Sequence, residues 1–215
     1  MMRDFFDFDI YPVITEKFCR NGSAVETLKQ VLGGGAKTVQ IREKEYDKGK
    51  ILDMAFSFRK LTAEAGAALI INDHVDIAMI VQADGVHLGQ EDIPCREAKK
   101  LAPSLKVGVS THNIEEALKA INDNADYINI GPIFPTSTKE TKYGFLGVKK
   151  LEEISGRVAM PFTVMGGIKE DNIRKVLAAG ARRIALVTEI TMSDNPEEMT
   201  RRLKNIMESY EKSHI

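Results

Sequence analysis

The chain has 215 residues, of which 43% are hydrophobic and 28% are charged, and its formal net charge is -1. These values are ordinary for a soluble globular protein, and they exclude a broad charged surface for nucleic acid or membrane. No apolar run is long enough to span a bilayer, and acidic residues interrupt the N-terminal phenylalanines where a secretory signal would be apolar. The two cysteines lack CxxC or metal-ligand spacing, which indicates free thiols in a reducing compartment. We therefore expect a cytoplasmic protein that acts on small molecules.

Short apolar or β-branched runs alternate with helical patterns along the whole chain. Eight runs are predicted as strands: Tyr11–Thr15, Thr38–Arg42, Ala68–Asn72, Gly85–Leu88, Lys106–Ser110, Tyr127–Gly131, Phe162–Met165 and Ile184–Val187. A predicted helix follows each: Val25–Leu32, Lys48–Ala65, Val75–Val81, Arg96–Leu101, Ile114–Ile121, Val148–Ile154, Glu170–Ala179 and Pro196–Glu211. This alternation indicates a parallel sheet with right-handed crossovers, and eight units fit a closed barrel. The prediction is a single α/β domain over residues 1–215, a (β/α)8 TIM barrel, with residues 1–10 as an N-terminal extension.

A weak internal repeat supports the barrel. Just before four of the predicted strands stand the pairs Gly35-Ala36, Gln82-Ala83, Asn124-Ala125 and Gly180-Ala181. Gly and Asn suit the end of a helix, and a small Ala lets the chain turn into the barrel floor. Ordinary helix-to-strand loop chemistry would explain the same pattern.

Polar side chains gather at the C-terminal ends of the predicted strands, where barrels of this class build their active sites. At the second strand Gln40, Arg42 and Lys44 occupy alternate positions, so a period of two places them on one face. Arg offers a planar fork of donors and Lys a point charge, so this strand end predicts an anion site. A solvated strand end with incidental charges is the alternative.

Carboxylates follow the third and fourth strands. The third ends in Asn72-Asp73, and the fourth leads into Asp92. Either acid alone could be a helix N-cap. Because Asp73 and Asp92 come from adjacent strand ends, together they predict a Mg²⁺ site with room for water and a diphosphate. His87 lies on the fourth strand itself and is interpreted as a hydrogen-bonded structural residue.

The remaining strands add hydroxyls and backbone amides. The fifth ends in Ser110, which an N-cap would also explain, and the sixth leads into a long connection that reaches about Gly147. Long connections in compact barrels are usually functional, and we expect this one to close over bound ligand. Its phosphate-binding candidates are Thr136, Ser137, Thr138 and Lys139, and a flexible surface loop is the alternative.

The last two strands end in Gly166-Gly167 and Val187-Thr188. Bare backbone amides after these strands form the phosphate site that recurs in many barrels, although a tight turn would also explain the glycine pair. The predicted site therefore has two halves. Strands two to six suit a diphosphate with a metal ion, and strands seven and eight suit a monophosphate.

Five motifs in order resemble the thiamine phosphate synthase family. They are Gln40–Lys44, Asn72–Ala78, Asp84–Asp92, Gly108–His112 and Gly131–Lys139, and with Gly166-Gly167 the similarity extends from about Tyr11 to Ile190. The family condenses hydroxymethylpyrimidine diphosphate with a thiazole phosphate, which gives thiamine phosphate and pyrophosphate. The resemblance thus implies a transferase with two small-molecule substrates.

The resemblance also implies roles for individual residues. The pyrimidine diphosphate would be held by Gln40, Arg42, Lys44, Asn72, Ser110 and Lys139, and Mg²⁺ by Asp73 and Asp92. The thiazole and its phosphate would be held by Thr136, Thr138, Gly167, Val187 and Thr188. The implied chemistry is a dissociative substitution without a protein nucleophile, in which Arg42, Ser110 and Lys139 stabilise the leaving pyrophosphate.

Two other functions are compatible with the same barrel. A thiazole tautomerase-like isomerase would need an acid/base residue, for which His112 is the candidate, and a non-catalytic ligand-binding barrel would need none. Glu189 departs from the small residue that the family usually has there, and its carboxylate would repel a phosphate unless it points away. The sequence does not define the oligomeric state, and it is compatible with a homo-oligomer.

Overall fold

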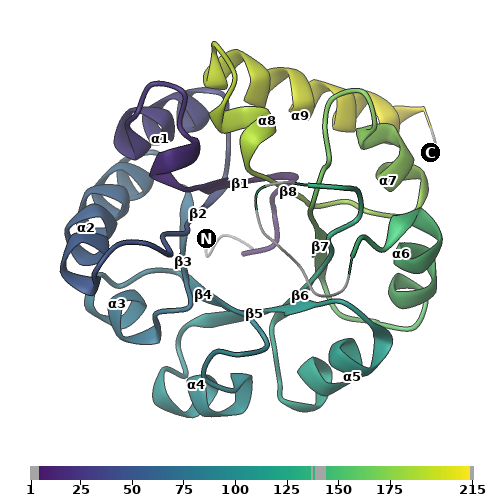
Figure 1. Cartoon of the computed structure of the whole chain (residues 1–215), viewed down its shortest axis with the longest axis horizontal. Helices are drawn as coiled ribbons and strands as arrows, with labels where there is room; N and C mark the ends of the chain where they lie inside the picture. Colours follow the sequence, from purple (N-terminus) through teal and green to yellow (C-terminus); the bar gives the residue numbers. More distant parts are fainter. Residues whose placement is uncertain (1–4, 137, 139–143, 214–215) are drawn as a thin grey trace.

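The strands close into one parallel barrel in chain order, with β8 paired to β1 (Figure 1). The computed structural model describes residues 5–136, 138 and 144–213. The strands are β1 (Ile10–Ile14), β2 (Thr38–Ile41), β3 (Ala68–Asn72), β4 (Gly85–Leu88), β5 (Lys106–Thr111), β6 (Tyr127–Ile130), β7 (Phe162–Val164) and β8 (Ile184–Leu186). The predicted (β/α)8 barrel is therefore confirmed.

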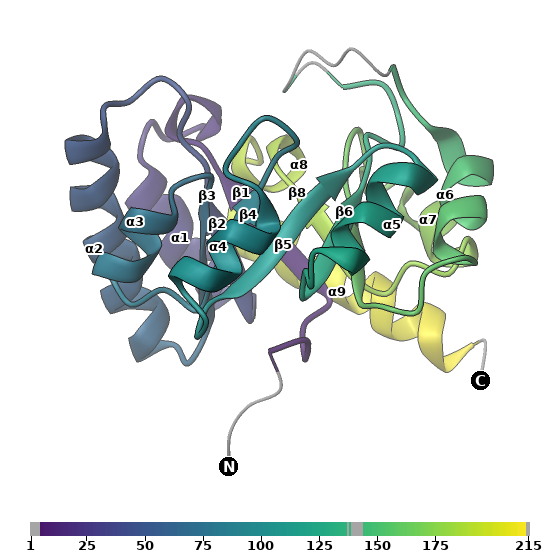
Figure 2. The ribbon, with the colours of Figure 1, turned by 90° about the horizontal axis from the view of Figure 1, so that it is seen from below.

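Aromatic side chains fill the floor of the barrel. Tyr11 and Tyr127 are almost completely buried, and the rings of Phe5 and Phe6 lie 6.3 and 6.2 Å from that of Tyr127. Figure 2 shows the N-terminal segment approaching from the end of the barrel opposite the short helix α8 (Thr188–Thr191). The described part of the N-terminal extension thus closes the floor, so that the barrel opens at the C-terminal ends of the strands.

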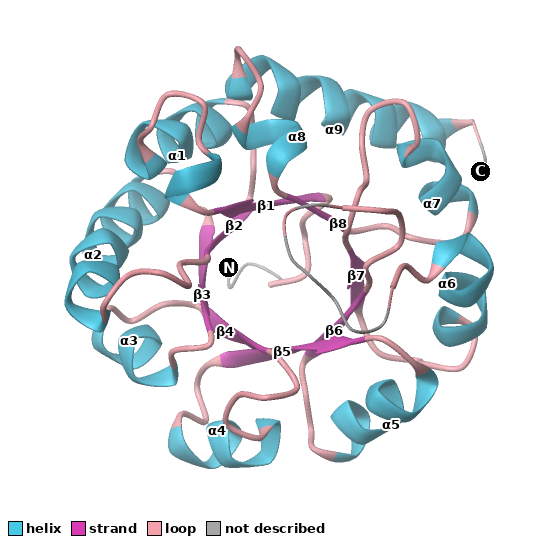
Figure 3. Cartoon of the chain, viewed as in Figure 1, coloured by secondary structure: helices cyan, strands magenta, loops and turns pink. Residues whose placement is uncertain are grey.

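Helices surround the sheet on its outer side (Figure 3). They are α1 (Ala24–Gly33), α2 (Lys48–Glu64), α3 (Val75–Ile80), α4 (Cys95–Leu101), α5 (Ile114–Asn122), α6 (Gly147–Ser155), α7 (Ile173–Ala178) and α9 (Pro196–Lys212), with a 3₁₀ turn at Glu16–Phe18. Among the described residues, no helix is both long and apolar enough to cross a membrane.

Two helix predictions need correction. The sequence patterns missed α8, because a four-residue helix is too short to show a period. Helix α7 begins at Ile173 and not at Glu170, since the side chain of Asn172 accepts a hydrogen bond from the Lys169 amide at 2.8 Å and holds a turn there. The other predicted helices agree with the structure to within a residue or two at each end.

The residue repeat marks one recurring helix ending. In each case the amide of the Ala donates to the carbonyl five residues back, as Ala83 does to Ala78 at 2.9 Å. This is the Schellman pattern, which requires a left-handed residue before the Ala. These residues and their φ angles are Gly35 at 89°, Gln82 at 53°, Asn124 at 60° and Gly180 at 91°. Each ending turns the chain into an even-numbered strand.

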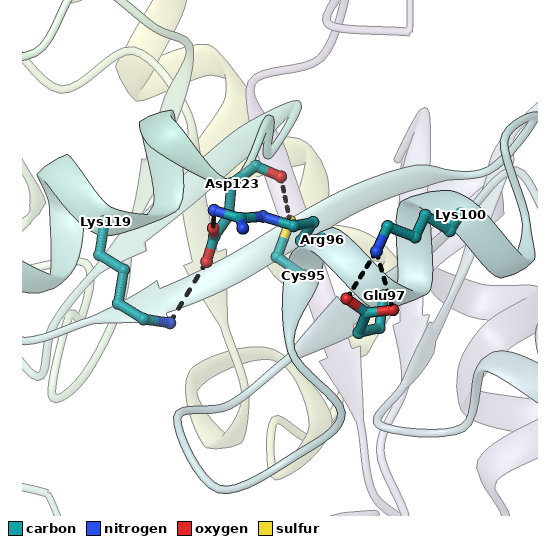
Figure 4. A network of polar contacts seen from close by, with 6 residues as sticks. All are labelled: Cys95, Arg96, Glu97, Lys100, Lys119 and Asp123. Carbon is teal, nitrogen blue, oxygen red and sulfur yellow. Dashed lines mark hydrogen bonds and ion pairs between the residues drawn. The ribbon is translucent and has the colours of Figure 1, made fainter.

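Polar contacts also join neighbouring helices on the outside. Asp123, which is buried at the end of α5, accepts from Arg96 of α4 at 2.9 Å and from Lys119 at 3.3 Å (Figure 4). The Cys95 thiol donates to the Asp123 carbonyl, and burial raises the pKa of Cys95 to about 11. Cys19 and Cys95 are both free thiols, as predicted, and both are buried.

Gly108 makes room for Tyr127 inside the barrel, which yields a test of the packing. A Cβ at Gly108 would lie 2.1 Å from Cζ and 2.5 Å from the hydroxyl of Tyr127. Gly108→Ala should therefore lower the free energy of unfolding by about 1–3 kcal/mol, as overpacking does in a tight core. Urea unfolding measures this, with Gly49→Ala in α2 as the control that should not destabilise. Equal stability of the wild type and Gly108→Ala would contradict the packing described here.

Candidate active site

Two cavities adjoin at the C-terminal ends of the strands. Their volumes are about 80 and about 250 Å³. We call them the smaller and the larger cavity. Five residues line both: Arg42, Ser110, Asn129, Met165 and Ala185. A ligand in one cavity would therefore lie next to a ligand in the other.

The residues predicted for the diphosphate half come together in the smaller cavity. Besides the shared Arg42 and Ser110, it is lined by Gln40, Lys44, Asn72, Asp73 and Asp92. The predicted alternation along β2 is confirmed, since Gln40, Arg42 and Lys44 all reach this cavity. Lys139 and most of the connection between Pro135 and Gly147 lie outside the described residues.

Two hydrogen-bond donors that lack partners among the described residues face the smaller cavity. The amide nitrogen Nδ2 of Asn72 is buried and has no hydrogen-bond partner among the described residues. Arg42 is half-buried and makes no ion pair within that part of the chain. Burial lowers the pKa of Arg42, while the carboxylates of Asp73 and Glu43 act in the opposite direction, and an arginine stays charged at neutral pH. A half-buried cation and a buried amide that lack partners among the described residues favour an anionic ligand.

The carboxylates of Asp73 and Asp92 lie within hydrogen-bond reach of each other. Burial and the neighbouring Asp92 raise the pKa of Asp73, although an ion pair with Lys44 opposes them. Burial also acts to raise the pKa of Asp92, but hydrogen bonds from Asp73 and from the Gly89 amide at 2.6 Å lower it overall. The two carboxyls therefore titrate as a coupled pair and not independently.

This pair is a small donor set for a metal ion. The backbone of Asp73 is left-handed, with φ of 64°, and its amide donates to the His87 carbonyl at 2.8 Å, which turns the carboxylate toward Asp92. Among the described residues, no group of three or more His, Cys, Asp or Glu side chains is placed to hold a metal. Two carboxylates alone suit Mg²⁺, which keeps several waters and binds phosphate oxygens.

The repulsion between the two carboxylates predicts a stability effect. Because the folded state raises the pKa of Asp73, ionised Asp73 destabilises the fold above that pKa, and the penalty disappears below the ordinary aspartate pKa of about 3.9. Asp73→Asn should therefore stabilise the chain at pH 7 by on the order of 1 kcal/mol. The gain should shrink as the pH falls toward 4.

Thermal unfolding from pH 4 to pH 8 measures this effect. Asp92→Asn is the matched control, because the lowered pKa of Asp92 means that the fold favours its charged form. That variant should be less stable than the wild type at pH 7. A loss of stability in Asp73→Asn at every pH would show that Lys44 more than offsets the repulsion.

The residues predicted for the monophosphate half line the larger cavity: Thr136, Thr138, Gly167, Val187 and Thr188. The Thr136 hydroxyl donates to that of Thr138 at 3.1 Å. Gly167 has φ of 63°, and a Cβ there would lie 2.4 Å from the Pro135 carbonyl. Gly167 is therefore required by a tight turn, and it also leaves its backbone bare toward the cavity.

The carboxylate of Glu189 also lines the larger cavity, as the sequence suggested it could. Its Oε1 atom accepts a hydrogen bond from the Glu170 amide at 2.8 Å. This contact ties one carboxylate oxygen to the loop before α7. It reduces the repulsion that a phosphate beside Thr188 would meet.

Several cavity residues were not predicted from the sequence. The smaller cavity also includes Tyr11 and His87, and both cavities share Asn129. Period two along β6 from Tyr127 indicates that Asn129 points inward, so this residue could have been found. His112 lines the larger cavity, and its Nδ1 atom lies 2.8 Å from a carboxylate oxygen of Glu116.

A closed barrel with two adjoining cavities at its C-terminal end, lined by cationic side chains and hydrogen-bond donors, is typical of enzymes that act on phosphorylated substrates. The family model for thiamine monophosphate synthase matches residues 10–190. The thiamine-phosphate synthase of Caldicellulosiruptor saccharolyticus is 40% identical over 210 residues, which cover 97% of this chain and 95% of the relative. That of Dictyoglomus turgidum is 40% identical over 205 residues, which cover 95% and 92%.

A solved structure is similar as well. The thiamine phosphate pyrophosphorylase from Pyrococcus furiosus has a TM-score of 0.88 and 33% identity, with coverage of 94% of this chain and 96% of that one. The chain belongs to the thiamine monophosphate synthase family. It is accordingly an enzyme of the transferase class.

Proposed function

We propose that this transferase forms thiamine phosphate with one substrate in each cavity. The pyrimidine diphosphate occupies the smaller cavity and the thiazole phosphate the larger, and pyrophosphate is released when they join. The observation that carries this proposal is the shared wall of Arg42 and Ser110, which would bring the reacting atoms of the two substrates together. The names and near-complete coverage of the relatives support the same reaction.

The reaction needs positioning and charge stabilisation from this chain and no protein nucleophile. The C–O bond to the diphosphate breaks first, and its electron pair leaves with the diphosphate oxygen. Arg42, Lys44 and the free amide of Asn72 donate to that oxygen or its neighbours as negative charge grows there. The thiazole nitrogen then supplies the electron pair for the new C–N bond, and no proton is transferred.

Asp73 and Asp92 would hold Mg²⁺. A magnesium ion at this position supplies positive charge to the leaving diphosphate. Lys44 pairs with Asp73, so it is close to the place where the diphosphate would lie. We place Ser110 beside the departing group together with Lys139, whose position the structure does not describe.

The alternatives use only part of this arrangement. A tautomerase-like isomerase would need the larger cavity and the His112–Glu116 pair, and it would leave Arg42, Lys44 and Asn72 without a role. A non-catalytic barrel would gain nothing from two carboxylates in contact. We also infer that the enzyme works in the cytoplasm, because its two thiols are free.

The metal assignment predicts a loss of activity. A chelator should abolish product formation, and added Mg²⁺ should restore it. Asp92→Ala should lower kcat by about 100-fold or more with the fold intact, since the leaving group loses its counter-charge. Product formation at varied Mg²⁺ concentration is the measurement, with circular dichroism as the check on folding. Full activity of the wild type in the chelator would contradict the assignment.

The division into two cavities predicts that a substitution in one cavity weakens the binding of only one of the two substrates. Lys44→Met should weaken the pyrimidine diphosphate about tenfold to a hundredfold and leave the thiazole phosphate unchanged, because Lys44 lines only the smaller cavity. Thr188→Val keeps the shape of Thr188 without the hydroxyl, and it should weaken only the thiazole phosphate. Equilibrium binding of each substrate alone measures both effects. If each variant weakens both ligands equally, the two-cavity division is wrong.

A further inference from the structure

A chain of hydrogen-bonded polar side chains crosses the barrel interior, and four of its five members line the smaller cavity. The Gln40 amide nitrogen donates to the Tyr11 hydroxyl at 2.7 Å, and the Tyr11 and Tyr127 hydroxyls lie 3.2 Å apart. The Tyr127 hydroxyl lies 3.1 Å from Nδ1 of His87, whose Nε2 atom lies 2.9 Å from the Ser110 hydroxyl. The two ends, Gln40 and Ser110, are substrate-binding residues under the proposed function. The three residues between them are Tyr11, Tyr127 and His87.

The direction of this chain follows from its first member. An amide nitrogen can only donate, so the Tyr11 oxygen accepts from Gln40. Tyr11 then donates its single hydroxyl proton in a hydrogen bond to Tyr127, which is its other hydrogen-bond partner among the described residues. If the buried Tyr11 hydroxyl did not donate a hydrogen bond, its proton would be an unsatisfied donor, which costs free energy.

The same argument carries the direction to Ser110. Tyr127 accepts from Tyr11, so its own proton is directed to Nδ1 of His87. A neutral imidazole that accepts at Nδ1 carries its proton on Nε2, and this proton is donated to the Ser110 oxygen. The hydroxyl proton of Ser110 is then free for a ligand. At the other end, the carbonyl oxygen Oε1 of Gln40 is free to accept.

We propose that Tyr11, Tyr127 and His87 are positioning residues that set the hydrogen-bond polarity of the smaller cavity, with an acceptor at Gln40 and a donor at Ser110. This proposal rests on the proposed function. A substrate whose aminopyrimidine becomes cationic while its diphosphate departs as an anion fits that polarity. Its exocyclic amine donates to Gln40, which increases the electron density that stabilises the methylene cation. The Ser110 proton is available to the departing oxygen, beside Arg42.

The packing below encloses Tyr127, the middle residue of this hydrogen-bond chain. Gly108 leaves the space that the Tyr127 ring occupies, and Phe5 and Phe6 cover that ring from the floor. Burial raises the pKa of both tyrosines far above neutral pH, so both phenols keep their protons. The hydrogen bond of each hydroxyl constrains that of the next, so the polarity at one end is coupled to that at the other.

Removing the middle hydroxyl should uncouple the two ends. In Tyr127→Phe, Tyr11 loses its acceptor and can donate back to Gln40, whose amide can then turn over. His87 loses the donor at Nδ1, so the other tautomer becomes available and Ser110 can donate to His87 instead of the ligand. Tyr46→Phe is the matched control, because the Tyr46 hydroxyl contacts Glu16 and lines neither cavity.

Calorimetric binding separates positioning from a general structural role. Tyr127→Phe should weaken the pyrimidine diphosphate about tenfold or more, while inorganic pyrophosphate with Mg²⁺ changes less than about twofold. Tyr11→Phe should have a similar effect, and the double variant should be no worse than either single one, because all three interrupt one chain. Equal weakening of pyrophosphate, or additive effects of the two substitutions, would overturn the proposal. Tyr46→Phe should bind both ligands as the wild type does.

Nitrogen-15 NMR of labelled histidine tests the direction without any substrate. The wild type should show His87 as the tautomer protonated on Nε2, and Tyr127→Phe should show a mixture or the Nδ1-protonated form. A wild-type His87 protonated on Nδ1 would reverse the chain and overturn the proposal, whatever the variants bind. If the tautomer is as expected but the wild type does not bind the pyrimidine diphosphate, the proposed function fails and the assigned polarity stands.

Discussion

Pairing of β8 with β1 is the contact on which the site depends. Ile10, Tyr11 and Pro12 of β1 are in register with Ile184, Ala185 and Leu186 of β8, and this pairing closes the ring. Only a closed ring brings Arg42, at the end of β2, to the same cavities as Val187 and Thr188 after β8. In an open sheet these residues would stand at separate edges. Closure therefore converts eight separate strand ends into one site with two adjoining cavities.

The polar groups of the barrel interior are of two kinds: some satisfy one another by hydrogen bonds, and others lack a partner or contact a like charge. Tyr11, Tyr127 and His87 satisfy one another by hydrogen bonds, as buried polar groups generally do. At the cavity wall Asn72 keeps an unpartnered amide, and Asp73 sits against Asp92 in a left-handed backbone conformation. These features lower the stability of the fold. They are the features that an anionic ligand with a cation would relieve, which is why we assign them to function.

Much of the fold was predictable from the sequence, because hydrophobic periodicity reports which face of an element is buried. The eight strands followed from such patterns, and the helix ending at Asn124 followed from the preference of Asn for that position. Helix α8 did not, because it is shorter than the window in which a period can be seen. The chain through Tyr11 and Tyr127 did not either, since it joins residues 116 positions apart that meet only when the barrel closes.

The candidate site was predictable for a different reason. In a parallel barrel every strand end reaches the same face, so polar residues at those ends predict a shared site without any contact being known. The assignment of Lys44 to one half of the site and of Thr188 to the other followed from strand position in this way. What position could not show is which partners each side chain has. The ion pair of Lys44 with Asp73 and the bond between Glu189 and the Glu170 amide needed coordinates.

The central claim is that two substrates in adjoining cavities are joined by this chain with loss of pyrophosphate. The most direct measurement is the amount of each product formed by the purified protein from the pyrimidine diphosphate, the thiazole phosphate and Mg²⁺. We expect thiamine phosphate and pyrophosphate in equal amounts, and neither when one substrate is omitted. Pyrophosphate release without thiamine phosphate, or no product from both substrates together, would contradict the account.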